Sequence, residues 1–133
     1  MRQVVIVEDT AKDAKLAIDV FRKMGATDVQ VYDNIPAAVV QLRDILEDRR
    51  QAPDVILLDL SFPNDSGFEI LRLWKSNAKL QKIPVVVWTV MGDTEQKICN
   101  YFGVEKIVPK WSGARGLETA LSAFGQSAGS AVQ

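Results

Sequence analysis

The feature that most constrains the fold is a set of short apolar runs that end in polar residues. Residues 55–58 read Val-Ile-Leu-Leu and stop at Asp59, and residues 4–7 read Val-Val-Ile-Val and stop at Glu8 and Asp9. Runs without polar alternation are typical of strands covered on both faces, as in a parallel sheet between two layers of helices. Because an ionised carboxylate is costly to bury, these acids are predicted to lie where their strands end.

The other apolar patterns alternate between helix and strand. Strands are predicted over residues 2–7, 29–32, 55–58, 85–89 and 104–108. Helices are predicted over residues 10–24, 35–46, 66–77, 94–102 and 114–124. Strands that alternate with helices predict an α/β fold, a doubly wound five-stranded parallel sheet with helices on both faces. The first, third and fourth strands are apolar throughout and should be central, which leaves the second and fifth as edges.

Composition narrows the class of protein. The 133 residues include 47% hydrophobic side chains and carry a net charge of −1, which predicts one globular domain and no attraction to nucleic acid or an anionic membrane. No apolar run approaches the roughly 20 residues of a membrane span. A single cysteine, Cys99, and the absence of histidine exclude an internal disulfide and imidazole chemistry. We expect a cytoplasmic domain over residues 1–125 and a flexible C-terminal tail over residues 126–133.

Four predicted strands deliver polar groups to the same edge of the sheet. Because the carboxyl ends of parallel strands meet at one edge, groups distant in sequence could share one crevice there. Three converging carboxylates would repel one another and raise at least one pKa, and a divalent cation or an ammonium would relieve that repulsion. Magnesium prefers oxygen ligands such as these carboxylates. An amine and a hydroxyl can donate hydrogen bonds to phosphoryl oxygens. The groups are Glu8, Asp9, Asp59, Thr89 and Lys110.

Over nearly its whole length the chain resembles the receiver domain of two-component response regulators. The acidic pair after the first strand matches the family's metal-binding acids. Asp59 matches the phosphoacceptor, with Pro63 and Gly67 four and eight residues beyond it. Thr89, 30 residues after Asp59, matches the switch hydroxyl, and Lys110 matches the lysine at the end of the fifth strand. The resemblance implies the flavodoxin-like strand order 2-1-3-4-5.

The resemblance also implies a phosphorylation switch rather than an enzyme with a diffusible product. Asp59 would accept a phosphoryl group from a phosphohistidine on a histidine kinase or a histidine phosphotransfer protein. Mg²⁺ would be held by the side chains of Asp9 and Asp59, by the carbonyl of Ser61, and by Glu8 through water. The domain would catalyse only its own phosphorylation and dephosphorylation.

The resemblance also implies how phosphorylation would be signalled to another protein. Lys110 would pair with one phosphoryl oxygen, and Thr89 would close onto another. An unknown downstream protein would read that movement through direct contact. The family's usual dimer surface implies a homodimer through the elements predicted at residues 94–102, 104–108 and 114–124.

The chain departs from the family pattern around the lysine. The family usually has an aromatic residue three positions before it, where this chain has Ile107, and a proline after it, where this chain has Trp111. Isoleucine cannot make the same rotation, so coupling of the switch to its output face is expected to change. Trp88, Tyr101 and Trp111 could replace the aromatic residue, although core or half-buried packing is the simpler role for each.

Two rival interpretations stay open. One is a receiver-like interaction module without phosphoryl transfer, which the departure at Ile107 favours and the full set of acids and lysine opposes. The other is a hydrolase with an aspartate nucleophile. Such a hydrolase normally has a second aspartate two residues after the first, where this chain has Ser61. A nucleotide-binding fold is disfavoured because no glycine-rich phosphate loop follows the first strand.

Overall fold

The computed structural model describes residues 1–62 and 67–132. Its strands are β1 (Gln3–Val7), β2 (Asp28–Tyr32), β3 (Val55–Leu58), β4 (Val85–Thr89) and β5 (Lys106–Pro109). Its helices are α1 (Ala11–Lys23), α2 (Ile35–Leu46), α3 (Phe68–Ser76), α4 (Ala78–Gln81), α5 (Asp93–Phe102) and α6 (Gly113–Val132), with a 3₁₀ turn, η1 (Lys110–Ser112), between β5 and α6.

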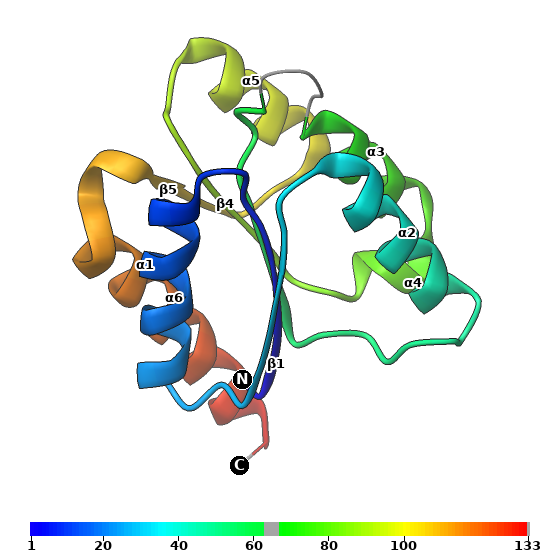
Figure 1. Ribbon diagram of the computed structural model, residues 1–133, viewed down its shortest axis with the longest axis horizontal. Coiled ribbons are helices and arrows are strands. Elements are labelled where there is room, and N and C mark those ends of the chain that lie inside the picture. The colour runs from blue at the N-terminus through cyan, green and yellow to red at the C-terminus, as the bar shows by residue number, and fades with distance from the viewer. Residues whose placement is uncertain (63–66, 133) are drawn as a thin grey trace.

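The five strands form one parallel sheet in the order β2-β1-β3-β4-β5. Both the strand order and the edge positions of β2 and β5 are therefore confirmed. Figure 1 shows the strands between two layers of helices, with α1 and α6 on one side and α2, α3 and α4 on the other. The prediction of a doubly wound α/β fold is confirmed.

Alternate residues of the central strands fill two separate cores. Val5 and Val7 of β1 face the core shared with α2, α3 and α5, whereas Val4 and Ile6 face the core shared with α1 and α6. This alternation explains the unbroken apolar runs, because a strand covered on both faces needs apolar side chains at every position. Cys99 of α5 packs in the first core, as expected for a small apolar side chain.

The predicted start of the second helix is confirmed. The Asn34 side chain accepts a hydrogen bond of 2.8 Å from the backbone N–H of Ala37, and Pro36 lies in the first turn of α2. Both features are favoured at helix starts, because the first N–H groups of a helix have no partner within it.

Two helices differ from their predicted bounds by two residues or more at one end. The helix predicted over 66–77 is observed as α3, and the short α4 follows it as a separate turn. Pro63 and the predicted helix start at Ser66 lie outside the described residues. The last helix was predicted to end at residue 124, which is wrong, because α6 continues to Val132. Its final segment contains no proline to stop it. The flexibility of residues 126–133 stays a prediction.

Among the described residues, no helix is both long enough and apolar enough to cross a membrane.

Candidate functional site

The sheet brings the predicted site residues to one edge. In the parallel register Val7 pairs with Leu58, and Leu58 pairs with Val87, so the carboxyl ends of β1, β3 and β4 lie side by side. Glu8 and Asp9 follow β1, Asp59 follows β3, Thr89 ends β4, and Lys110 follows β5. Hydrogen bonds and short distances bring these five residues together at this edge, and their roles stay predictions.

Asp59 is a buried carboxylate with a donor for each oxygen. Its exposed fraction is 3%. Its Oδ1 accepts hydrogen bonds from Thr89 Oγ1 at 2.7 Å and from the backbone N–H of Ser61 at 2.9 Å. Its Oδ2 accepts one from Lys110 Nζ at 3.0 Å. Donors of this kind allow a carboxylate to stay buried, because they replace the water it loses.

Lys110 supplies the positive charge of the site. Its Nζ donates to Glu8 Oε1 at 2.6 Å, to Asp13 Oδ2 at 2.7 Å and to Asp59 Oδ2 at 3.0 Å. Burial by itself would lower the pKa of this ammonium, but the hydrogen bonds to Asp13, Glu8 and Asp59 together raise that pKa above its ordinary value. Lys110 is therefore the ammonium that balances the acids of the site.

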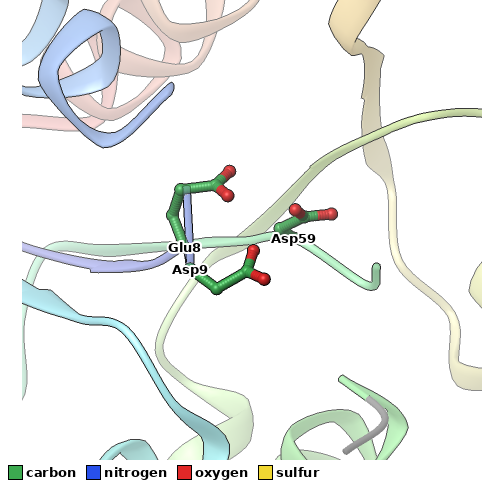
Figure 2. Close-up of side chains that lie close together, drawn as sticks. All are labelled: Glu8, Asp9 and Asp59. Carbon is green, nitrogen blue, oxygen red and sulfur yellow. The ribbon is translucent and has the colours of Figure 1, made fainter. Parts of the chain in front are cut away.

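Glu8, Asp9 and Asp59 form a compact group of acids. Each offers a carboxylate oxygen, and these oxygens lie within 4.8 Å of one another. Figure 2 shows Glu8 and Asp9 reaching in from the end of β1, with the Asp9 carboxylate turned toward Asp59. Burial raises the pKa of Glu8 to about 7 although the hydrogen bond from Lys110 lowers it, and the charge of Asp59 raises it further. The predicted increase of a carboxyl pKa therefore falls on Glu8, and burial contributes more to it than the charge of Asp59.

These three acids fit a divalent cation. They provide hard carboxylate oxygens at mutual distances that one ion could span, and such oxygens are the donors that magnesium and manganese prefer. Ser61 contacts the same group, because its hydroxyl lies 3.1 Å from Thr89 Oγ1 while its backbone N–H donates to Asp59. The role of the Ser61 carbonyl as a ligand stays a prediction.

Asp13 is a site residue that was not predicted from the sequence. This residue lies in the first turn of α1, four positions after Asp9, and its carboxylate accepts from Lys110. An acidic residue one helical turn beyond an acidic pair is a weak signal, since acids are common in the first turn of any helix. Only the distance between α1 and Lys110 shows that it belongs to the site.

The three aromatic residues that could replace the family's aromatic switch residue differ in their exposure to solvent. Trp88 is buried, and the Lys110 ammonium lies 5.0 Å from the centre of its ring, so packing is confirmed for this residue. Tyr101 and Trp111 are 80% and 85% exposed, so the prediction that they pack in or near the core is wrong.

The sequence is similar to known bacterial signalling proteins. The family model of the response regulator receiver domain matches residues 4–122. The chain is 33% identical over 97 residues to the phosphate regulon transcriptional regulatory protein PhoB of Klebsiella pneumoniae, and this match covers 73% of the chain but only 39% of PhoB. It is 30% identical over 129 residues to the polar-differentiation response regulator DivK of Brucella anthropi, a match that covers 95% of the chain and 98% of DivK.

Solved structures show the same similarity. The Mn²⁺-bound form of response regulator Rcp1 superposes with a TM-score of 0.71 at 27% identity, covering 83% of this chain and 81% of that one. The phosphorylated cyanobacterial phytochrome response regulator RcpA superposes with a TM-score of 0.77 at 25% identity, covering 92% and 90% of the two chains. The fold, the acids at the sheet edge and the match over residues 4–122 agree, and the chain belongs to the response regulator receiver domain family.

Proposed function

We propose that this domain is a phosphorylation switch in which Asp59 accepts a phosphoryl group from a phosphohistidine of a histidine kinase or a histidine phosphotransfer protein. The observation that carries the proposal is the pairing of the two Asp59 oxygens with the Lys110 ammonium and the Thr89 hydroxyl. A carboxylate oxygen of Asp59 would attack phosphorus, and the P–N bond to the partner's imidazole would break. The electron pair of that bond would leave with the imidazole, which then takes up a proton.

The side chains around Asp59 have distinct roles in this reaction. Lys110 offsets negative charge on the phosphoryl oxygens, and the Thr89 hydroxyl, which now donates to Asp59, becomes a donor to one of those oxygens. Glu8, Asp9 and Asp59 are the residues that would hold Mg²⁺, together with the Ser61 carbonyl. Bound Mg²⁺ would supply positive charge that stabilises the transferring group. The metal-bound and phosphorylated states of the similar proteins Rcp1 and RcpA support both parts of the proposal.

The output would leave through protein contacts on the face made by α5, β5 and α6. Thr89 ends β4 and pairs with Pro109 of β5, so a change in its hydrogen bonds would occur next to this face. Tyr101 of α5 and Trp111 of η1 are exposed and would contact a downstream protein or a second copy of the chain in the cytoplasm. Exposed aromatic side chains are enriched at such contacts because they bury a large apolar area.

Acetyl phosphate with Mg²⁺ tests the phosphoryl transfer without a partner protein. Intact mass spectrometry should show the addition of one phosphoryl group to the wild type and none to Asp59→Asn. The adduct should decay with time as the domain catalyses its own dephosphorylation. A wild type that stays unmodified, or an Asp59→Asn variant that is modified equally, would contradict the proposal.

The alternative is a receiver-like interaction module without phosphoryl transfer. Ile107 favours it, because this half-buried side chain packs against the core shared with α2, α3 and α5 and offers no aromatic ring to rotate. In that case the exposed aromatic residues would bind a partner regardless of the state of Asp59. The same mass measurement separates the two functions, since the module would show no adduct.

A further inference from the structure

Lys110 has more partners than the proposed reaction uses. Its ammonium carries three N–H donors, and all three are engaged, by Glu8, Asp13 and Asp59. Asp59 is the proposed phosphoacceptor, and Glu8 is one of the acids that fit a metal ion. Asp13 has neither role, yet its contact with Lys110, at 2.7 Å, is shorter than that of Asp59, at 3.0 Å.

Trp88 provides a second contact that the reaction does not use. Its ring lies 5.0 Å from the Lys110 ammonium, close enough for the ring electrons to attract the charge. Trp88 is 2% exposed and is held within the core shared with α1 and α6, so the ring is a fixed surface. The ammonium therefore has two contacts, Asp13 and Trp88, that do not depend on the state of Asp59.

We propose that Asp13 is a positioning residue. It keeps the Lys110 ammonium in place when Glu8 and Asp59 release that ammonium and bind a divalent cation instead. The inference rests on the proposed function, because it concerns the same lysine and the same acids. A mostly buried ammonium that lost two of three acceptors at once would be left poorly solvated, and that loss would oppose metal binding. An acceptor that stays in place lowers this cost and leaves the lysine within reach of a phosphoryl group.

An effect of Asp13 through Lys110 differs from a direct electrostatic attraction between Asp13 and the metal ion. Any carboxylate near the site attracts a cation, whether or not it touches the lysine. If Asp13 acts through Lys110, its effect on metal affinity must depend on the presence of that lysine. A double-mutant cycle measures this dependence.

The experiment measures the Mg²⁺ affinity of four proteins by titration against melting temperature: wild type, Asp13→Asn, Lys110→Met and the double variant. We expect Asp13→Asn to weaken Mg²⁺ binding about five-fold when Lys110 is present. In the Lys110→Met background the same change should have at most about a two-fold effect. Asp13→Glu should restore most of the affinity. Asp19→Asn, which removes one exposed charge from the same helix, should leave the affinity unchanged.

Equal weakening in both backgrounds, or no weakening by Asp13→Asn, would overturn the inference. A crystal structure of the wild type with Mg²⁺ tests it without the Lys110→Met variant, in case that variant does not fold. Lys110 should still donate to Asp13 there, and a lysine that has left Asp13 would overturn the inference. If the wild type binds no Mg²⁺ or accepts no phosphoryl group, the proposed function fails. If it does both while Asp13→Asn has no effect on Mg²⁺ affinity, the inference alone fails.

Discussion

At the scale of single residues, the site depends on buried charges that are nearly all paired. Asp59 accepts three hydrogen bonds, from Thr89, Ser61 and Lys110, and Lys110 donates three. Each bond involves a charged group removed from water, so the loss of one donor costs more here than at the surface. Thr89 is the simplest donor to remove, because valine has nearly the same shape.

Thr89→Val should destabilise the metal-free domain. The hydroxyl that donates to Asp59 at 2.7 Å would be replaced by a methyl group, which leaves Oδ1 with the Ser61 N–H alone. We expect a loss of about 1–2 kcal/mol in the free energy of unfolding, measured by urea denaturation in EDTA. Thr89→Ser keeps the hydroxyl and serves as the control, with a smaller loss. A Thr89→Val variant as stable as the wild type would show that this hydrogen bond contributes little.

At the scale of elements, the start of α3 lies unusually close to the end of β3. A Cβ added at Gly67 would lie 2.8 Å from the carbonyl oxygen of Asp59 and 2.9 Å from the Cα of Leu60. The backbone at Gly67 has φ of −61°, so any residue could adopt it. Glycine is therefore required here by the close approach of two backbone segments and not by backbone conformation.

Gly67→Ala should disturb both stability and the site. The added methyl group would push α3 away from the segment that carries Asp59, which we expect to cost about 1–3 kcal/mol. Urea denaturation measures the loss, and the rate of acetyl phosphate labelling measures the effect on Asp59. Gly92→Ala is the control, because its Cβ would meet only the flexible end of Glu95. Gly92 is the N-cap of α5, so this change should cost up to about 1 kcal/mol and leave the rate of labelling unchanged. Equal effects of the two substitutions would contradict the argument.

The amino ends of β1 and β3 are joined by one carboxylate. Asp54 Oδ2 accepts the backbone N–H of Arg2 at 2.8 Å and that of Gln3 at 3.0 Å. The N–H of Gln3 contributes most to lowering the pKa of Asp54, burial opposes it, and the N–H of Arg2 lowers the pKa further. Folding lowers the pKa of this carboxyl, so its ionised form stabilises the folded state at pH values above the pKa of the unfolded chain. This contribution is lost as the pH falls through the pKa of the folded state.

Asp54→Ala should therefore cost stability at pH 7 and cost less at acidic pH. Because Asp54 is exposed, the pH-dependent part should be at most about 1 kcal/mol. Urea denaturation of both proteins at several pH values from 7 down to 3 measures the difference between them. A difference that stays constant over this range would show that the ionised form has no special role.

At the scale of the whole molecule, the acid group leaves an excess of negative charge at one edge of the sheet. Three carboxylates, those of Glu8, Asp13 and Asp59, contact one ammonium, that of Lys110. A fourth, that of Asp9, lies beside Glu8 and Asp59. The chain as a whole is almost neutral, with a net charge of −1, so this excess is local. A cation bound there would stabilise the folded state by mass action.

Mg²⁺ should accordingly raise the melting temperature of the domain relative to EDTA. At a concentration ten times its Kd the gain would be about 1.4 kcal/mol, which corresponds to an increase of roughly 5 °C for a domain of this size. Differential scanning fluorimetry over a Mg²⁺ series measures it. Asp9→Asn should shrink the increase, because Asp9 contributes one of the three oxygens that fit the ion. An increase of equal size in Asp9→Asn would place the ion elsewhere.

Much of the fold was predictable because its determinants are local. The apolar run at residues 55–58 identifies a strand covered on both faces. The polar residues 105 and 106 of the strand predicted over 104–108 indicate an edge strand, which is observed as β5. The cap at Asn34 is likewise readable from neighbouring residues. The short α4 and the length of α6 were not predicted, since neither has the apolar spacing or the stop signal that marks a helix boundary.

The sequence by itself determined which strands are central and which polar residues reach the edge of the sheet. An unbroken apolar run indicates a strand buried on both faces, and the Asp59 or Glu8 that ends it indicates where the burial stops. Only the tertiary structure decided how those residues pair. It placed Asp13 against Lys110, turned Trp111 to the surface, and brought Gly67 against the backbone of Asp59. The physical reason is that periodicity describes which side of an element is apolar, whereas hydrogen bonds and close contacts depend on distances between elements that packing alone sets.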